Sequence, residues 1–581
     1  MRTTRTLRQV GRGRLRHAQV VLAGLALALV FAVASCGQKE KPSEPRVPRE
    51  VEVPLYLKDT VGELARFAGR ESLAVQGYGF VTGLDGTGTK VIPPGVRQQI
   101  LDMMRRHKIE NPEEVISSPD NAVVLVTGLL TPGIARGEVF DIEVRALPTT
   151  ETTSLEGGYL LECDLARVMS ARGVEERSEI LAIGRGSIFV SPFTAEDKSK
   201  LTSDPRVGRV LAGGKCAKMR HFRLALLTPS VRTADQIVRL INARFKGAAK
   251  GTEDPGRVDL EVPPEFEEEK EHFLDLIGAL YLRETPDARD QRVNLLIDRL
   301  KEGKDMDRVA VCLEAFGPMV VPHLRLLTKH PSAAVRFYVG RTLANLQDAQ
   351  AVSLLEPVAL DNKSEFQELA VESMGRLRSG VGLGVLSRAL NAKSARVRVA
   401  AWQAMARLAP RTFISRVFPD KFSLSLVSTT GEPFVYVSRT LRPEVAIFGD
   451  VSIRPPALVE TRRVTATAAA GVEEITLITR WHDKDYCVKA PLEVKGFIQW
   501  LAAPMDLDKK PEPQGLDLGY SDVVGLLNEL GRKKALTAPV VLQPLKFRIG
   551  GDRPVARPIG ESEETIETAP LPPPPGTKKE P

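Results

Sequence analysis

The glycine-rich stretch from Gln76 to Lys90 has the residue types that come nearest to a phosphate-binding loop. It reads Gln-Gly-Tyr-Gly-Phe-Val-Thr-Gly-Leu-Asp-Gly-Thr-Gly-Thr-Lys. A nucleotide P-loop needs lysine directly after its last glycine, so that the ammonium reaches the β- and γ-phosphates. Here Thr89 follows Gly88 and the lysine comes one residue late, and no third glycine completes the dinucleotide pattern Gly-x-Gly-x-x-Gly. The stretch therefore predicts a short strand that leads into a structural glycine turn.

The histidines and cysteines do not have the spacing of a metal site or of a catalytic site. The histidines beyond the N-terminal segment lack the His-x-x-x-His and His-Glu-x-x-His patterns that bind zinc. His482 and Asp483, beside Asp485 and Cys487, come nearest to a cluster, and they fall on an expected β-turn. We therefore expect no catalytic residue, no metal site and no cofactor.

The first 35 residues have the composition of a bacterial targeting segment. Six arginines up to Arg16 precede an apolar run that is too short, and too close to the N-terminus, to favour a permanent membrane span. The tetrapeptide Val-Ala-Ser-Cys ending at Cys36 matches the lipobox, in which the cysteine is diacylated before cleavage. An ordinary signal peptide with an incidental cysteine is the alternative. We expect a lipoprotein signal peptide at 1–35 and a lipid on Cys36, which anchors the mature chain.

Cleavage at that point changes the charge of the chain. Of 81 basic residues 75 remain against 73 acidic ones, so the formal charge falls from +8 to +2. So small a net charge removes the electrostatic reason to expect nucleic-acid binding. The length of 581 residues is enough for several domains. The sequence leaves open whether Cys163, Cys216, Cys312 and Cys487 form disulfides in an oxidising compartment.

The chain up to residue 285 is expected to be a tether followed by a mixed region. Residues 36–54 combine Lys, Glu and Pro with few apolar residues, which is typical of a flexible tether. Thr233 and Gln236 have the spacing of a capping box at the start of a helix. Within 55–285, the periodicity predicts helices at 95–109, 235–245 and 265–282 and strands at 122–130, 139–147, 180–191 and 257–263.

Four motifs in this region carry a resemblance to one family. Residues 77–88 read Gly-Tyr-Gly-Phe-Val-Thr-Gly-Leu-Asp-Gly-Thr-Gly and residues 121–132 read Asn-Ala-Val-Val-Leu-Val-Thr-Gly-Leu-Leu-Thr-Pro. Residues 137–144 read Gly-Glu-Val-Phe-Asp-Ile-Glu-Val, and residues 154–161 read Ser-Leu-Glu-Gly-Gly-Tyr-Leu-Leu. In this order they resemble the flagellar P-ring proteins. The resemblance implies a structural signature turn formed by Gly77, Tyr78, Gly79, Gly83, Gly86, Thr87 and Gly88.

Residues 286–410 contain a repeat with a period of 31 residues. Val339, Ala370 and Ala401 have this spacing, and apolar residues four before, four after and seven after each of them trace one face of a helix. Two helices per unit are typical of an α-solenoid, and the pattern resembles short HEAT-type repeats. The opposite face could be a solvated surface or could bind an acidic partner. It carries Arg336, Arg341, Arg376, Arg396 and Arg398.

After residue 410 the strand pattern returns. The order of elements resembles the C-terminal half of P-ring proteins, so we expect a P-ring-like β-rich region at 411–550, with the solenoid inserted before it, and a disordered Pro-rich tail at 551–581. The expected fold class is α+β with an inserted α-solenoid. Expected here are strands at 422–427, 434–438, 445–453 with a turn at Gly449-Asp450, 464–468, 475–480 and 538–542, and a helix from a Ser521 cap to Gly531.

The resemblance implies a structural subunit of a homo-oligomeric periplasmic ring around the flagellar rod. Its implied partners are the rod and peptidoglycan or outer-membrane ring proteins, and it would act by assembly and not by catalysis. The lipid anchor and the solenoid depart from typical members, which are released into the periplasm. Gly37 follows the cysteine, and by resemblance to enterobacterial lipoprotein sorting the absence of Asp at this position indicates the outer membrane. The alternative is a lipid-anchored periplasmic scaffold that uses its HEAT-type repeats to bind another envelope protein.

Overall fold

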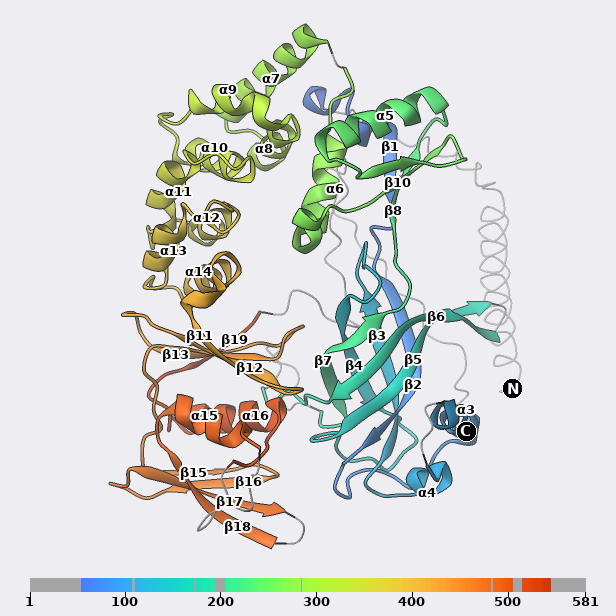
Figure 1. Ribbon diagram of the computed structural model, residues 1–581, viewed down its shortest axis with the longest axis vertical. Helices are drawn as coiled ribbons and strands as arrows, with labels where there is room; N and C mark the ends of the chain where they lie inside the picture. Colours follow the sequence, from blue (N-terminus) through green and yellow to red (C-terminus); the bar gives the residue numbers. More distant parts are fainter. Residues whose placement is uncertain are drawn as a thin grey trace, which may run out of the picture. The chain divides into compact units, whose positions relative to one another are not determined.

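The computed structural model of the chain is shown in Figure 1. It describes residues 54–106, 110–171, 174–193, 204–283, 285–481, 484–504 and 515–544. The predicted signal peptide, Cys36, the tether up to residue 53 and the tail at 551–581 lie outside these residues. In the described ranges no helix combines the length and the apolar character that crossing a bilayer requires. Several sheets and a long helical segment are present, which confirms the α+β class.

The N-terminal region contains a closed β-barrel whose strands follow the order β2-β3-β4-β7-β6-β5. Each neighbouring pair is antiparallel. In β4, buried residues alternate with less buried ones, because successive side chains point into and out of the barrel. The strands are β2 (Leu73–Thr82), β3 (Ala122–Leu130), β4 (Val139–Ala146), β5 (Tyr159–Ala171), β6 (Val174–Ser187) and β7 (Val207–Cys216). Helices α3 (Pro94–Arg106) and α4 (Pro112–Ile116) add Ile100 and Ile116 to the barrel core.

Glycines make this narrow barrel possible. A Cβ atom on Gly79 would lie 2.7 Å from Leu160 Cδ1 and 2.9 Å from Val126 Cγ2, which is closer than side-chain carbons pack. A Cβ atom on Gly128 would lie 2.6 Å from Cε2 of the Phe140 ring. Glycine in these strands therefore marks places where the barrel has no room for a side chain.

A second sheet, of order β1-β8-β10-β9, combines one strand that precedes the barrel strands in the sequence with three strands that follow them. Ser230 caps helix α5, because its side chain accepts a bond from Thr233 N at 3.3 Å, whereas Gln236 donates to Leu282 O at 2.9 Å. The predicted capping box at Thr233 is therefore wrong. The elements are η1 (Leu55–Leu57), α2 (Val61–Leu64), β1 (Ala65–Ala68), β8 (Phe222–Leu226), α5 (Val231–Arg244), β9 (Ala249–Gly251) and β10 (Arg257–Leu260).

The helix predicted at 265–282 consists of two pieces. A 3-10 turn, η2 (Pro264–Glu269), is followed by α6 (Lys270–Ala279). The break falls at Glu269, whose backbone, at φ −131° and ψ 43°, is not helical. The consecutive acidic residues Glu267 to Glu269, at the start of the predicted helix, therefore belong to a separate turn that precedes α6.

A stack of helices follows, as Figure 1 shows for α7 to α14. Val339, Ala370 and Ala401 are fully buried, as the 31-residue period requires. The turns repeat with the same period: Arg378 N donates to Gln347 Oε1 at 3.0 Å, and Lys393 N to Asn362 Oδ1 at 3.0 Å. The elements are α7 (Pro286–Lys301), α8 (Met306–Ala315), η3 (Gly317–Val320), α9 (Val321–Arg325), α10 (Ala333–Asn345), α11 (Ala351–Ala359), α12 (Gln367–Met374), α13 (Leu383–Ala389), α14 (Ala395–Leu408) and η4 (Pro410–Thr412).

The C-terminal region has two sheets, of order β11-β12-β14-β13-β19 and β15-β16-β17-β18. The strand predicted at 445–453 ends at Phe448, and the chain bends at Gly449, whose φ is +72°, but the described residues after this turn do not pair back with β14. Instead β14 pairs in parallel with β12, a long-range pairing that turn residues do not reveal. The strands are β11 (Ile414–Phe418), β12 (Phe422–Val427), β13 (Phe434–Val437), β14 (Glu444–Phe448), β15 (Ala457–Glu460), β16 (Val464–Ala468), β17 (Glu474–Trp481), β18 (Lys484–Pro491) and β19 (Val540–Leu542).

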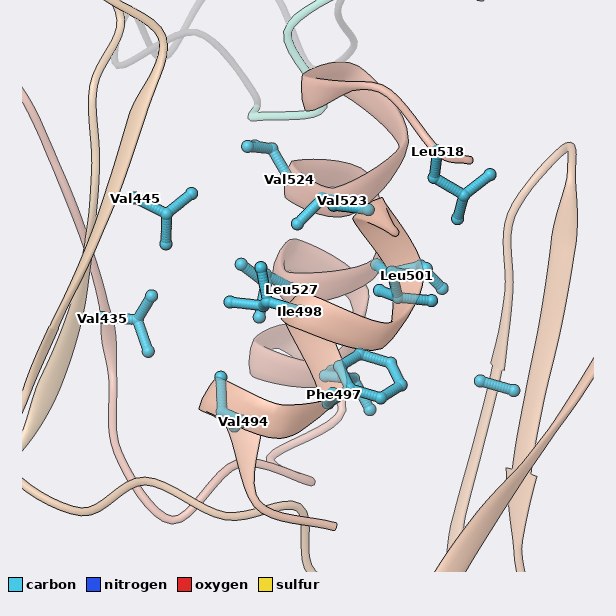
Figure 2. Close-up of a cluster of buried hydrophobic side chains, with 14 of the residues drawn as sticks. Val435, Val445, Val494, Phe497, Ile498, Leu501, Leu518, Val523, Val524 and Leu527 are labelled. Carbon is cyan, nitrogen blue, oxygen red and sulfur yellow. The ribbon is translucent and has the colours of Figure 1, made fainter. Parts of the chain in front are cut away.

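Two helices, α15 (Val494–Ala502) and α16 (Tyr520–Arg532), supply the core of this region. In Figure 2, Val435 and Val445 of the first sheet face these helices, while Phe497, Leu501 and Leu518 lie on the side away from that sheet. Helix α16 is capped by Gly519, not by the predicted Ser521. The reason is that Asp522 reaches back to accept a bond from Gly519 N at 3.2 Å.

Candidate functional site

Of the signature residues, Gly77, Tyr78 and Gly79 lie within strand β2, and the turn that directly follows this strand, at residues 83–88, requires glycine at two kinds of position. Gly83 and Gly86 have φ of +77° and +81°, a conformation that side chains disfavour. At Gly88 the constraint is space, since an added Cβ atom would lie 2.1 Å from the Asn121 carbonyl oxygen. Tyr78, one strand position from Gly77 and Gly79, is partly buried and packs against the barrel core. The predicted strand followed by a glycine turn is thus present at these residues.

The backbone N–H groups of this turn bind the neighbouring loop at 118–121. Gly86 N donates to Asp120 Oδ1 at 2.8 Å, and Gly88 N donates to the Pro119 carbonyl at 2.9 Å. Leu84 N and Thr89 N donate to the carbonyls of Asp120 and Asn121, both at 2.8 Å. A phosphate cradle would need these donors free. The turn instead uses these donors for hydrogen bonds to the neighbouring loop at 118–121.

Thr87 joins the signature turn to the motif at 154–161. Its hydroxyl donates to the Leu84 carbonyl at 2.8 Å and to the Ser154 carbonyl at 3.0 Å. Its own carbonyl accepts a bond from Thr153 N at 2.9 Å. Two of the motifs that carry the family resemblance thus form one loop cluster.

Two consecutive arginines from the turn between β15 and β16 bind this loop cluster. The Arg462 guanidinium donates to the carbonyls of Leu84, of Asp85 at 3.3 Å and of Glu156 at 2.9 Å. Arg463 lies 3.9 Å from the Asp85 carboxylate of the signature turn and 3.5 Å from the Asp522 carboxylate of α16. The signature turn therefore holds the C-terminal region against the barrel.

Carboxyl groups at this contact have perturbed ionisation. Burial raises the pKa of Asp522, while Arg463 opposes the rise. Burial also raises the pKa of Glu156, and the charge of Asp522 adds to it. A third carboxylate, Asp141 of β4, accepts bonds from Ala212 N and Leu441 N at 2.8 Å, and burial raises its pKa. Asp141 therefore joins the barrel to the C-terminal region at a cost in desolvation.

The described residues contain no cluster of three or more His, Cys, Asp or Glu that could hold a metal ion. His482 and Asp483 lie outside the described residues, and Cys487 is exposed on β18. The four cysteines named above are all free. Burial raises the pKa of Cys163 and of Cys312 to about 12, so both thiols stay protonated and unreactive at neutral pH.

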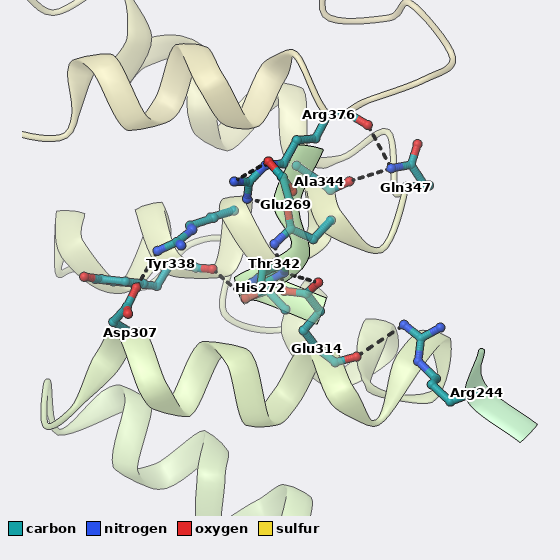
Figure 3. A network of polar contacts seen from close by, with 12 residues as sticks. Arg244, Glu269, His272, Asp307, Glu314, Tyr338, Thr342, Ala344, Gln347 and Arg376 are labelled. Atoms are coloured by element: carbon teal, nitrogen blue, oxygen red, sulfur yellow. Dashed lines mark hydrogen bonds and ion pairs between the residues drawn. The ribbon is translucent and has the colours of Figure 1, made fainter. Parts of the chain in front are cut away.

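The arginines of the helical stack do not share one solvated face. Arg376 pairs with Glu269 and Arg341 with Asp307, both within the chain (Figure 3). Arg398 is only 2% exposed, so its placement on the outer face was wrong. Arg336 donates to loop carbonyls beside its own helix, whereas Arg396 is exposed to solvent.

The buried position of Arg398 follows from the next region of the chain. Its guanidinium donates to the Leu390 carbonyl at 2.9 Å, to the Glu432 carbonyl and to Thr429 Oγ1 at 3.0 Å. It also lies over the Phe434 ring, 4.7 Å from its centre. All of these partners except Leu390 come after the repeats, so the repeat pattern could not reveal them.

Residues 60–294 match the family model described as flagellar P-ring protein. The P-ring protein of a Bradyrhizobium species is 30% identical over 280 residues, which cover 46% of this chain and 71% of the relative. The chain belongs to the flagellar P-ring protein family. A further P-ring protein, from Geotalea uraniireducens, is 27% identical over 344 residues, which cover 57% of this chain and 85% of the relative. Membership confirms the resemblance carried by the four motifs.

A second family model, described as HEAT repeats, matches residues 320–406. The HEAT-type segment predicted from the 31-residue period is therefore confirmed, and it lies C-terminal to the P-ring match. The P-ring model ends at residue 294, so the P-ring-like character of 411–550 stays a prediction. The sequence revealed the glycine turn, but it contained no signal that Arg462 and Arg463 bind it.

Proposed function

We propose that this chain is a structural subunit of a periplasmic ring around the flagellar rod, and that it acts by assembly and not by catalysis. The observation that carries the proposal is its similarity to the Bradyrhizobium P-ring protein over 71% of that relative. The closed barrel and the hydrogen-bonded signature turn, whose N–H donors bind the chain itself, suit a load-bearing part.

Ring formation requires the same two surfaces on every copy, arranged so that the last copy meets the first. The rod, and peptidoglycan or outer-membrane ring proteins, are the proposed partners of the assembled ring. Nucleic acid is not among them, because the charge of the mature chain is close to balanced.

In this proposal the signature residues have a structural part. Gly77 and Gly79 allow close packing inside the barrel. Gly83, Gly86, Thr87 and Gly88 shape the turn whose carbonyl groups bind Arg462, and we call this binding site the Arg462 socket. Residues 411–550 would then be the second half of the P-ring body. The Arg462 contact supports this assignment, because it links those residues directly to the family motif.

We place the protein in the periplasm, anchored to the outer membrane through a lipid on Cys36. The test is Cys36→Ala, expressed in the native cell and followed by fractionation. We expect the variant to move to the soluble periplasmic fraction or to accumulate as unprocessed precursor. If a correctly processed variant still fractionates with the outer membrane, the anchor is wrong.

The decisive experiment for the ring is deletion of the gene, scored by swimming and by electron microscopy of purified basal bodies. We expect non-motile cells whose rods lack the periplasmic ring, with both defects restored by the full-length gene. Normal swimming with intact basal bodies would instead support the alternative, a lipid-anchored scaffold that binds another envelope protein.

A further inference from the structure

The HEAT-type segment faces an acidic stretch of its own chain. This stretch is the turn η2 with the start of α6, and it contains Glu268 and Glu269. Arg376 Nε donates to Glu269 Oε1 at 2.9 Å, and Arg376 Nη2 forms an ion pair with the same oxygen at 2.9 Å. Arg407 Nε lies 3.8 Å from the Glu268 carboxylate. Arginines of two different repeats therefore bind adjacent glutamates in the P-ring part.

Behind these ion pairs runs a buried polar network (Figure 3). Arg376 Nη1 donates to Asn345 Oδ1 at 3.1 Å, and Asn345 Nδ2 donates to Glu314 Oε2 at 2.7 Å. The other oxygen of Glu314 lies 2.8 Å from His272 Nε2 on α6. Glu314 is 4% exposed, so these partners supply the hydrogen bonds that water would otherwise make to its carboxyl oxygens. The network links helices α8 and α10, and the turn after α12, to α6.

Both ends of the HEAT-type segment also contact other parts of the chain. At the first helix, Arg292 is 7% exposed and donates to the carbonyls of Leu55 and Lys58. At the last helix, Trp402 packs edge-on against Tyr436 and Phe448, with ring centres 5.8 and 5.9 Å apart. The segment is thus joined to the rest of the chain at its start, along its side and at its end.

We propose that the HEAT-type segment is an internal brace of the P-ring body and not an arm that recruits a separate acidic protein. In a solenoid each repeat contacts only its neighbours, so the stack by itself bends easily. Cross-links from Arg376, Arg407 and Glu314 to the turn η2 and helix α6 prevent that bending. Of the arginines for which an acidic partner was considered, Arg376 finds one within the chain in Glu269.

The other side of the stack supplies a matched control. Arg388 pairs with Glu356, and this exposed ion pair joins neighbouring repeats without touching η2 or α6. Its arginine is 55% exposed, against 25% for Arg376. Reversal of the charge at Arg388 should therefore leave the cross-link to η2 and α6 unchanged.

The test is a charge swap in the purified full chain, read by hydrogen exchange of the amides at 264–279. For Arg376→Glu and for Glu269→Arg we expect exchange about 2- to 5-fold faster than in the wild type, the range for a partly exposed ion pair. The double variant restores the pair in reverse and should bring exchange back toward the wild-type rate. Arg388→Glu should leave these amides unchanged.

Two outcomes would overturn the brace. One is that Arg376→Glu leaves exchange at 264–279 unchanged. The other is that the double variant exchanges as fast as the single ones, which indicates that the two side chains do not bind each other. These readings need no flagellum, so they stand even if the deletion strain swims normally and the ring proposal fails.

Swimming in a viscous medium extends the test to the cell. If the brace depends on the contact between Arg376 and Glu269, Arg376→Glu alone should slow swimming in this medium. The double variant, which restores the contact in reverse, should swim at the wild-type speed. An external acidic partner would still be repelled by the glutamate at 376. Equal loss in the single and the double variant would therefore favour recruitment and overturn the brace.

Discussion

Replacement of Arg398 by alanine is the perturbation for which the structure makes the sharpest prediction. Arg398 lies on α14, is 2% exposed, and donates to Leu390, Thr429 and Glu432. Arg396 lies two residues before it on the same helix and is exposed. The pair Arg398→Ala and Arg396→Ala therefore removes the same side chain from a buried site and from a solvated one.

The magnitude follows from the contacts. A hydrogen bond from a charged donor contributes about 1.5–3 kcal/mol to stability. The Leu390 carbonyl oxygen would still have a donor after the substitution, because Thr429 Oγ1 also donates to it at 2.8 Å. The contact with the Phe434 ring adds about 1 kcal/mol. Removal of the arginine also ends the cost of burying its charge, so the terms are not additive. We expect a net loss of about 3 kcal/mol for Arg398→Ala and under about 0.5 kcal/mol for Arg396→Ala.

The assay is hydrogen exchange of strand β13 (Phe434–Val437), which packs against this arginine, because global unfolding of a chain with several cores is not two-state. A loss of 3 kcal/mol corresponds to about 100-fold faster exchange through local opening. Arg396→Ala should exchange at the wild-type rate. The reasoning is refuted if the two variants exchange within about 3-fold of each other, because Arg398 would then contribute no more than an exposed arginine does.

Four other predictions concern the signature turn, the arginine that binds it, and two carboxyl groups, Asp522 and, at the start of α8, Asp305. Gly88→Ala should destabilise the barrel by more than about 2 kcal/mol, because its Cβ atom would lie 2.1 Å from a carbonyl oxygen, whereas Gly95→Ala, with nothing within 4 Å, should not lower the melting temperature. Arg462→Ala should speed proteolysis between the barrel and the C-terminal region, and an unchanged cleavage rate would show that the socket contributes no stability. Asp522 has a raised pKa, so its contribution to stability is fully present below about pH 4 and is lost as the pH rises through the raised pKa. Asp522→Asn should therefore reduce the fall in melting temperature as the pH rises toward neutral. Arg299 lowers the pKa of Asp305, so the stability that Asp305 contributes is lost in acid, and Asp305→Asn should make this loss smaller.

Local patterns in the sequence determined the elements themselves. Strand β3 has the predicted bounds, because alternation and β-branched residues act within a few positions. The 31-residue period located the HEAT-type helices, since each repeat must bury the same stripe on its neighbour. The glycine turn at 83–88 could also be predicted, because positive φ and close packing select glycine at single residues.

Helix caps were predicted less well, because competing residues lie side by side. Thr233 and Ser521 both have the chemistry of a cap, yet Ser230 and Gly519 occupy those positions. The choice depends on which residue leaves the helical conformation, and that depends on the chain before the helix. A pattern of residue types alone does not contain this information.

Only the tertiary structure decided which distant groups meet. Arg462 binds the Leu84 carbonyl 378 residues away, and Arg376 binds Glu269 107 residues away. Arg398 looked like a surface residue because its repeat exposes that face, and it is buried because a later strand covers it. Periodicity reports the neighbours of a residue along one helix or strand, whereas these contacts arise from the packing of elements whose positions are set by the whole core. The elements and the family could therefore be predicted from the sequence, but the contacts that make the HEAT-type segment a brace could not.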